Sequence, residues 1–318
     1  MINPSYDYFI TKIPVGIYPQ LPISADRYNE IRSARNVRLH ALYLEQKYDF
    51  LVENFVEFED ALLKESLREM TMQRYDFSDY SVTRGHFNRR IMNLLSTGRT
   101  YEDSVPQHIN SIFKRDPTAL SRSKAALSKQ YDSRLNYRAM CKLRNFIQHQ
   151  GLPVSGSFYH EKWVHLEEDA NPKSRHTVDP YLSLNELEDG DFNKNILSEL
   201  KNTGDKLDLK KAVREYVEGI SSAHLEIRVL ILEKITHADK VLKEAVDCYL
   251  KVWSGQTEIG LIAVELEDFS KIDKNFYENP VYIINNTDHY KNLLRKNVGL
   301  SNLVLRYVSS EARSEDFN

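Results

Sequence analysis

The sequence is poor in glycine and proline, contains only two cysteines, and has no long apolar run. Gly accounts for 11 and Pro for 10 of the 318 residues, which leaves few positions for tight turns and favours long helices. Cys141 and Cys248 are too few for a disulfide framework, so we expect a reducing, cytoplasmic location. No run approaches the ~20 apolar residues that span a bilayer, and no secretory signal is expected at the N-terminus. We therefore predict no contact with a membrane.

Several motifs that bind cofactors or metals are missing as well. The chain contains no GxGxxG, no GxxxxGK[ST], no HExxH, no GxSxG and no CxxC, so dinucleotide, phosphate-loop, zinc-protease and serine-hydrolase chemistry have no motif behind them. The sequence therefore predicts neither a cofactor nor a metal.

Charge is unevenly distributed, although the net charge is only −3. Residues 82–150 contain 13 Lys or Arg and 4 Asp or Glu, which gives +9, whereas the segments before and after them carry −4 and −8. So basic a segment suits a surface that binds a polyanion such as nucleic acid. It also suits a segment that docks onto acidic helices of its own chain, and both interpretations stay open.

Apolar residues recur at steps of three and four over long stretches, which predicts amphipathic helices. The longest patterns predict helices over about residues 26–72 and 209–253. Between them we expect one helix from Ser81 onward and another over residues 118–148, with a break near Gln130. The fold class is therefore mainly α.

Proline and glycine mark the expected helix ends. Pro106 is expected to set apart a short helix at 107–113, and Asp116 with Pro117 to cap and begin the next helix. Gly151 is expected to end the helix at 148 in the left-handed conformation. Four further local patterns are a loop at 75–80, a hairpin or ordered loop at 154–180, a capping box at 183–186 that opens a helix, and a helical piece at 288–296.

Strand-like patterns lie near both ends of the chain. Residues 5–23 hold β-branched and aromatic residues broken by three prolines, which predicts an extended arm or an edge strand. Three strand-like runs follow residue 253, at 257–268, 279–285 and 303–310. The expected organisation is an N-terminal arm (1–24), a helical bundle core (25–153), the hairpin or loop insertion (154–180), long helices packing on the bundle (181–254) and a small α+β tail (255–318).

One cluster of residues with suitable chemistry ends the basic segment: Arg144, Asn145 and His149. Asn145 and His149 share a helix face, whereas Arg144 and His149, five residues apart, are separated by about 140°. Arg144 and His149 converge only through a frayed last turn or across a dimer. RNA cleavage without a metal needs a base, an acid and positive charge at the phosphate. His149 suits the first two roles, Arg144 the third, and Asn145 an orienting role.

The string Arg144, Asn145, three residues and then His149 resembles the Arg-x4-6-His motif of HEPN domains, over about residues 25–153. The resemblance implies an antiparallel helical bundle, a homodimer with two motifs across a shared cleft, and a metal-independent endoribonuclease that cleaves RNA by 2′-hydroxyl attack. Many members of this family are toxins or antiphage defence effectors, which implies an antitoxin or an activating partner. Six further residues are expected to contact RNA: Arg89, Arg90, Asn93, Arg99, Arg138 and Lys142.

A structural interpretation of the same cluster stays open. Lys, Arg and His gather in the last turn of ordinary helices, because they complement the helix dipole and bond free carbonyls. On this interpretation Arg144 and His149 cap a helix, and the polar stripe that includes Arg89 and Asn93 is a solvated face. The alternative function is then a non-catalytic helical interaction or nucleotide-binding module.

Overall fold

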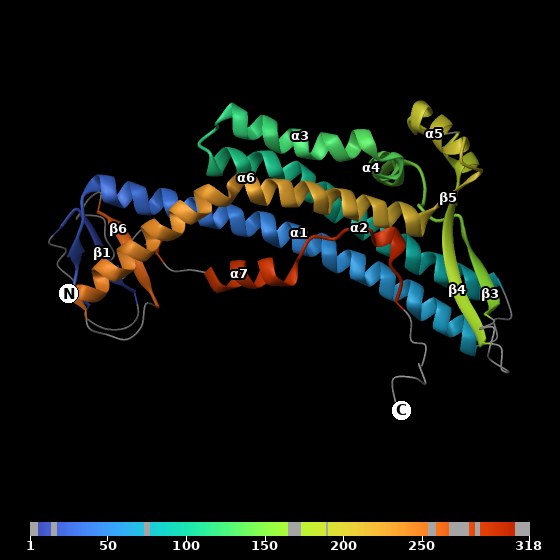
Figure 1. The fold of residues 1–318 in the computed structure, drawn as a ribbon, viewed down its shortest axis with the longest axis horizontal. Coiled ribbons are helices and arrows are strands. Elements are labelled where there is room, and N and C mark those ends of the chain that lie inside the picture. The colour runs from blue at the N-terminus through green and yellow to red at the C-terminus, as the bar shows by residue number, and fades with distance from the viewer. Residues whose placement is uncertain are drawn as a thin grey trace. The chain divides into compact units, whose positions relative to one another are not determined.

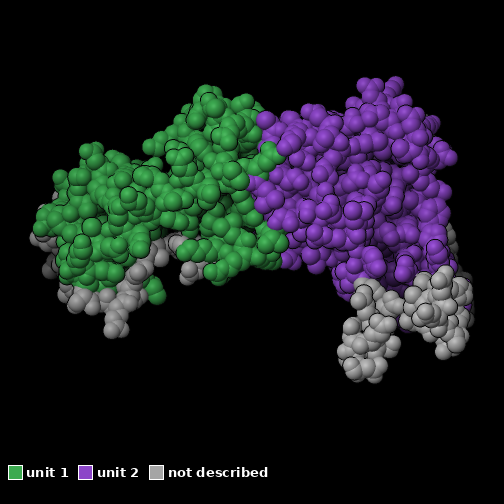
Figure 2. Space-filling model, in the orientation of Figure 1, with its two compact units in different colours: residues 1–46, 104–124, 226–298 green, residues 47–103, 125–225, 299–318 purple. Residues whose placement is uncertain are grey.

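The computed structural model of the protein describes residues 6–13, 18–72, 77–164, 173–188, 190–253, 259–266, 280–283 and 287–308. Over this part the chain is mainly helical, as the sequence predicts (Figure 1). It divides into two compact units, coloured separately in Figure 2, which we describe in turn. Unit 1 comprises residues 1–46, 104–124 and 226–298, and unit 2 comprises residues 47–103, 125–225 and 299–318.

Long helices dominate the described chain. The helices are α1 (Ala25–Thr71), α2 (Phe77–Ile112), α3 (Pro117–Ser133), α4 (Leu135–His149), α5 (Lys194–Lys201), α6 (Leu209–Val252) and α7 (Thr287–Lys296). The strands are β1 (Tyr8–Lys12), β2 (Leu21–Pro22), β3 (Gly156–Val164), β4 (Lys173–Ser183), β5 (Lys206–Asp208), β6 (Leu261–Glu265) and β7 (Val281–Tyr282). Two short 3-10 turns lie at Leu184–Leu187 and Leu303–Leu305.

The apolar seam predicted for the first long helix is buried along its whole length. All nine of its members keep less than a tenth of their surface exposed, because a stripe at steps of three and four faces the core on every turn. The helix ends observed for α1 and α6 agree with the predicted ends to within one residue. The buried residues of the α1 seam are Ala34, Val37, Ala41, Leu44, Tyr48, Leu51, Phe55, Phe58 and Leu62.

Unit 1 contains a four-stranded antiparallel sheet in the order β2-β1-β6-β7. The sequence predicted an arm or an edge strand near the N-terminus, but β1 is an inner strand whose partners are β2 and β6. The reason is apolar burial: Phe9 pairs with Val264, Ile10 pairs with Ala263, and all four are buried. The segments predicted as an N-terminal arm and a C-terminal tail thus share one sheet.

Unit 2 contains the predicted hairpin, which is formed by β3 and β4, and β5 extends it to three strands. Nine residues of β3 pair in antiparallel register with β4, from Gly156 with Tyr181 to Val164 with Lys173. The hairpin is tied to α2 at its start, where Oδ1 of the buried Asn88 accepts a hydrogen bond of 2.9 Å from the backbone N–H of Val154.

Two predicted interruptions of α2 are wrong. Residues 77–80 of the predicted loop already belong to α2, while residues 75 and 76 lie outside the described residues. Pro106 lies inside α2 rather than before a separate helix. An interior proline costs a helix about 3 kcal/mol, and here the buried residues Tyr101, Val105 and Ile109 on the same helix supply the compensating burial.

Three other boundaries also differ from the prediction. The break between α3 and α4 falls at Arg134, which has extended backbone angles, rather than near Gln130. The predicted capping box opens only a 3-10 turn, because Ser183 ends β4 and its N–H donates to Oγ of Ser155. The run at 303–310 forms a 3-10 turn at Leu303–Leu305 instead of a strand, and residues 309 and 310 lie outside the described part.

The predicted cap of α3 is confirmed. The backbone N–H of Thr118 donates to Oδ1 of Asp116 at 2.9 Å, and Pro117 is the first helical residue. Proline suits this position because it lacks only an N–H that the first turn leaves unbonded.

Candidate functional site

The candidate residues lie on α4, a short amphipathic helix of unit 2. Its inner face carries the buried side chains of Tyr137, Met140, Leu143 and Phe146. The helical hydrogen bonds continue to the end, where the N–H of Gln150 donates to the carbonyl of Phe146 at 2.8 Å. Because the last turn is intact, fraying does not bring Arg144 and His149 together within one chain.

The helix end is shaped by glycine, but not in the predicted way. The φ angle of Gly151 is not positive, so the residue does not adopt the left-handed conformation. A Cβ atom on Gly151 would instead lie 2.7 Å from Cε1 of Phe146, so only glycine fits against this ring. The side chain of Gln150 links the end of α4 to the chain before α5, because its Oε1 accepts a hydrogen bond of 2.9 Å from the N–H of Asp191.

The structure brings two of the three predicted catalytic residues into contact. Nη1 of Arg144 donates to Oδ1 of Asn145 at 3.3 Å. His149 is exposed and is the last residue of α4. Within the described part of the chain, His149 forms no hydrogen bond with Arg144 or Asn145.

The guanidinium of Arg144 is half-buried and lacks a carboxylate partner among the described residues. Its Nε–H group is buried and donates no hydrogen bond to the described residues. The positive charge of Arg144 also reaches Tyr216 of α6, where it opposes the large rise in pKa that burial imposes on the phenol. A half-buried cation without a counter-charge is costly unless an anion or water accompanies it.

A buried polar cluster that the sequence did not indicate lies on α2 and α4. The hydroxyl of Tyr137 donates to Oε1 of Glu102, and Sγ of Cys141 lies 4.0 Å from the same oxygen. Burial raises the pKa of Glu102, although the bond from Tyr137 and the charge of Arg99 oppose the rise. Burial likewise raises the pKa of the Cys141 thiol, so Cys141 is not a thiolate nucleophile at neutral pH.

Three of the six predicted RNA-binding residues are ion-paired within the chain. Arg90 pairs with Glu57 of α1, and Nη2 of Arg99 lies 2.8 Å from Oδ1 of Asp103. Arg138 makes a two-pronged bond of 3.0 and 2.7 Å to Glu199 of α5. These three cations of residues 82–150 therefore meet carboxylates of the same unit.

The other three predicted RNA-binding residues have no such partner. Arg89 and Asn93 are exposed on α2, and Lys142 is half-buried on α4. None of the three forms a side-chain hydrogen bond or an ion pair within the described ranges. Internal docking therefore accounts for Arg90, Arg99 and Arg138, whereas polyanion binding by the basic segment stays a prediction.

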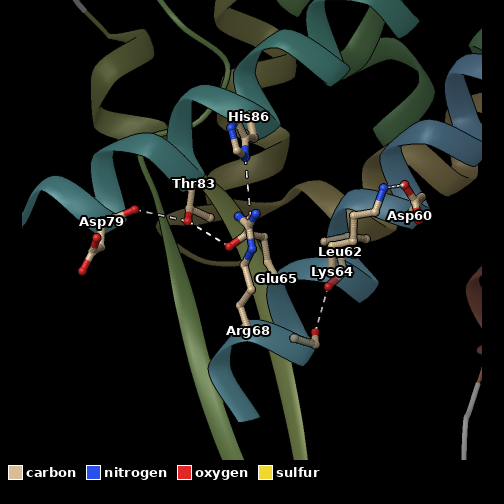
Figure 3. Close-up of polar contacts among 9 residues, drawn as sticks. Asp60, Leu62, Lys64, Glu65, Arg68, Asp79, Thr83 and His86 are labelled. Atoms are coloured by element: carbon tan, nitrogen blue, oxygen red, sulfur yellow. Dashed lines mark hydrogen bonds and ion pairs between the residues drawn. The ribbon is translucent and has the colours of Figure 1, made fainter. Parts of the chain in front are cut away.

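A second polar cluster, absent from the sequence predictions, joins α1 to α2 (Figure 3). Glu65 is buried, and its two carboxylate oxygens face different partners: Thr83 donates to Oε2 at 2.9 Å, and Arg68 donates to Oε1 at 2.9 Å. Nδ1 of His86 lies 3.6 Å from Oε1. Since the carboxylate is well supplied with donors, we interpret the cluster as a structural tie between the helices.

Within the described ranges, no group of three or more His, Cys, Asp or Glu side chains is placed to hold a metal ion. In the same residues, no helix combines the length and the apolar character needed to cross a membrane. Comparison with protein-family models, with curated proteins and with solved structures found no match to this chain. The functional interpretation therefore depends on the residues themselves.

Proposed function

We propose that the protein is a metal-independent endoribonuclease of the HEPN type. The observation that carries the proposal is Arg144: a half-buried guanidinium with a buried Nε and no carboxylate partner among the described residues, next to Asn145 and on the same short helix as the exposed His149. Arg138, one turn and a half earlier, has its charge matched by Glu199. Of these two arginines of α4, Arg144 is therefore the one whose charge is available to an RNA phosphate.

Each residue has a role that follows from its chemistry. His149 exchanges a proton with the attacking 2′-hydroxyl or the leaving oxygen, because an imidazole can both accept and donate a proton. Arg144 stabilises the charge that develops on the phosphate, and Asn145 orients the guanidinium through the hydrogen bond between them. The products are a 2′,3′-cyclic phosphate and a free 5′-hydroxyl.

The geometry of α4 supports a homodimer as the active form. The intact helix keeps Arg144 and His149 about 140° apart around its axis, so a His149 from a second copy is needed beside each Arg144. An HEPN-like helical bundle, a cytoplasmic location and a role as a toxin or antiphage defence effector under the control of a partner belong to the same proposal.

A specific observation favours a second candidate, a non-catalytic helical interaction or nucleotide-binding module. Arg90, Arg99 and Arg138 are matched by carboxylates of their own chain, as expected for a basic segment that docks internally. On this interpretation Arg144 and His149 act only at the end of helix α4.

The test is cleavage of single-stranded RNA in EDTA by the wild type, Arg144→Ala, His149→Ala and the control Arg122→Ala, which removes an exposed cation of α3. We expect cyclic phosphate ends from the wild type and the control, and a rate at least about 100-fold lower for the other two variants. If all four folded proteins are equally inert, or cleave equally, the ribonuclease proposal is wrong and the interaction module is favoured.

A further inference from the structure

Near its start, the hairpin of β3 and β4 in unit 2 has one face packed on its own unit and one face in solvent, whereas Glu161 and Trp163, farther along the packed side, are exposed as well. Successive side chains of a strand point to opposite faces. On β4, Val178, Pro180 and Leu182 are buried, whereas Arg175 is exposed and Asp179 is only partly buried. Tyr159 of the packed face contacts the ring of Tyr80 on α2 at 5.1 Å between centroids. The face that carries Phe158, His160 and Lys162 is therefore the outer one.

Two aromatic rings and a cation lie together on this outer face, at the end of the hairpin where β3 begins and β4 pairs with β5. The rings of Phe158 and Tyr181 stack with centroids 4.7 Å apart and an interplanar angle of 27°. Nζ of Lys206 on β5 lies over both rings, 4.7 Å from the centroid of Phe158 and 4.9 Å from that of Tyr181. Phe158 nevertheless keeps 43% of its surface exposed. An exposed flat ring held in place by its neighbours is suited to stack a planar base.

The remainder of the outer face is positively charged. Lys162 and Arg175 are direct cross-strand partners, and both are exposed. Neither forms an ion pair with the described residues. Like charges opposite each other destabilise a pair of strands, so this arrangement contributes nothing to the hairpin by itself. An external anion would relieve the repulsion.

The carboxylate of Asp179 on the same face is neutralised locally. Lys210 forms an ion pair with Oδ1 of Asp179, and Nε2 of His160 lies 3.5 Å from Oδ2. Asp208 of β5 is occupied at the start of α6, where its Oδ1 accepts a hydrogen bond of 3.1 Å from the N–H of Lys211. Among the described residues of the face, the charge left without an ion-pair partner is therefore positive, and it lies along the strands beside the stacked rings.

We infer that this outer face of the β3–β4 hairpin, centred on Phe158, Lys162, Arg175 and Lys206, binds single-stranded RNA. The chemistry of the face indicates this ligand. The cations bind the phosphates of the backbone, and the ring of Phe158 stacks on an unpaired base. In a duplex the bases are paired and stacked on one another, so they are not available to Phe158. The face would hold substrate for the proposed ribonuclease, but binding is defined and measured without any cleavage.

The test is fluorescence anisotropy of the full chain with a labelled 20-nucleotide 2′-O-methyl oligonucleotide, which cannot undergo 2′-hydroxyl attack. We expect Phe158→Ala to weaken binding about tenfold, and Lys162→Glu with Arg175→Glu to weaken it at least about tenfold and to flatten its salt dependence. The matched control, Lys240→Glu with Lys243→Glu, changes the net charge equally on exposed positions of α6 and should bind nearly as the wild type does.

Three results would overturn the inference: no binding by the wild type, equal weakening by the hairpin pair and the control pair, or equal affinity for a duplex that is insensitive to Phe158→Ala. If the face binds a protein and not RNA, the wild type does not bind the oligonucleotide, which is the first of these results. Because Phe158→Leu keeps an apolar side chain but removes the flat ring, it should bind as weakly as Phe158→Ala. Loss of cleavage in His149→Ala with unchanged binding of the oligonucleotide separates this face from the site on α4.

Discussion

The hydroxyl of Tyr101 lies 2.9 Å from Nδ1 of His224, and both side chains are buried in unit 2. The imidazole is stacked on its other side by Tyr48, whose ring centroid is 4.0 Å away at an interplanar angle of 20°. Tyr48 in turn donates to Oγ of Ser221 at 2.8 Å. Helices α1, α2 and α6 are thus joined through polar atoms inside the apolar core of this unit.

Removal of the Tyr101 hydroxyl should destabilise the protein. In Tyr101→Phe the buried His224 loses its hydrogen bond with the hydroxyl, and loss of a hydrogen bond costs about 0.5–1.5 kcal/mol. Urea unfolding followed by circular dichroism measures the loss. Tyr131→Phe on α3 removes a hydroxyl that forms no hydrogen bond with the described residues, and we expect its effect to stay below about 0.5 kcal/mol. Equal effects of the two substitutions would contradict this role of Tyr101.

Acid should weaken unit 1 through His40. Burial lowers the pKa of His40, whose Nδ1 lies 2.9 Å from Nδ1 of His108, so the folded protein favours the neutral imidazole. In the unfolded chain the pKa is about 6.5, so the unfolded state takes up the proton first. The stability from this group is complete above about pH 6.5 and is lost as the pH falls towards the lower folded pKa.

The measurement is the urea midpoint at pH 7.5 and pH 5.0 for the wild type and for His40→Asn, which keeps a polar group near the position of Nδ1 but does not titrate. The decrease on acidification should be smaller for His40→Asn. His237→Asn removes an exposed histidine of α6 and should behave as the wild type does. An equal decrease in all three proteins would rule out this contribution of His40.

Helices were predictable here because their signal is local and repeated. The seam of α1 recurs on every turn, so its bounds follow from the sequence alone. The errors arise where a distant contact decides the conformation. Ser183 has the sequence context of a helix cap, but its N–H bonds to Ser155, 28 residues away, and the strand continues to this point. Pro106 is tolerated because its neighbours on α2 are buried.

The candidate site was predictable only in part, for the same reason. Arg144, Asn145 and His149 are visible as one short motif. The pairing of Arg138 with Glu199 crosses 61 residues, and the bond from Tyr137 to Glu102 crosses 35. No rule of sequence spacing reveals such distant partners. The sequence therefore could not show that Arg138 forms an ion pair within the chain and that Arg144 forms none with the described residues.

Two glycines of α2 should respond in opposite ways to alanine. Gly85 is exposed and has nothing within 4 Å of an added Cβ, so Gly85→Ala should stabilise the protein by about 0.5–1 kcal/mol through helix propensity. At Gly98 the added Cβ would lie 2.3 Å from Oη of Tyr216, whose ring is fully buried and cannot move aside. Overpacking should therefore destabilise Gly98→Ala by about 1–3 kcal/mol. Thermal unfolding of the wild type and of both variants measures these two changes in stability. A stability of Gly98→Ala above that of the wild type would show that α2 and α6 do not approach so closely.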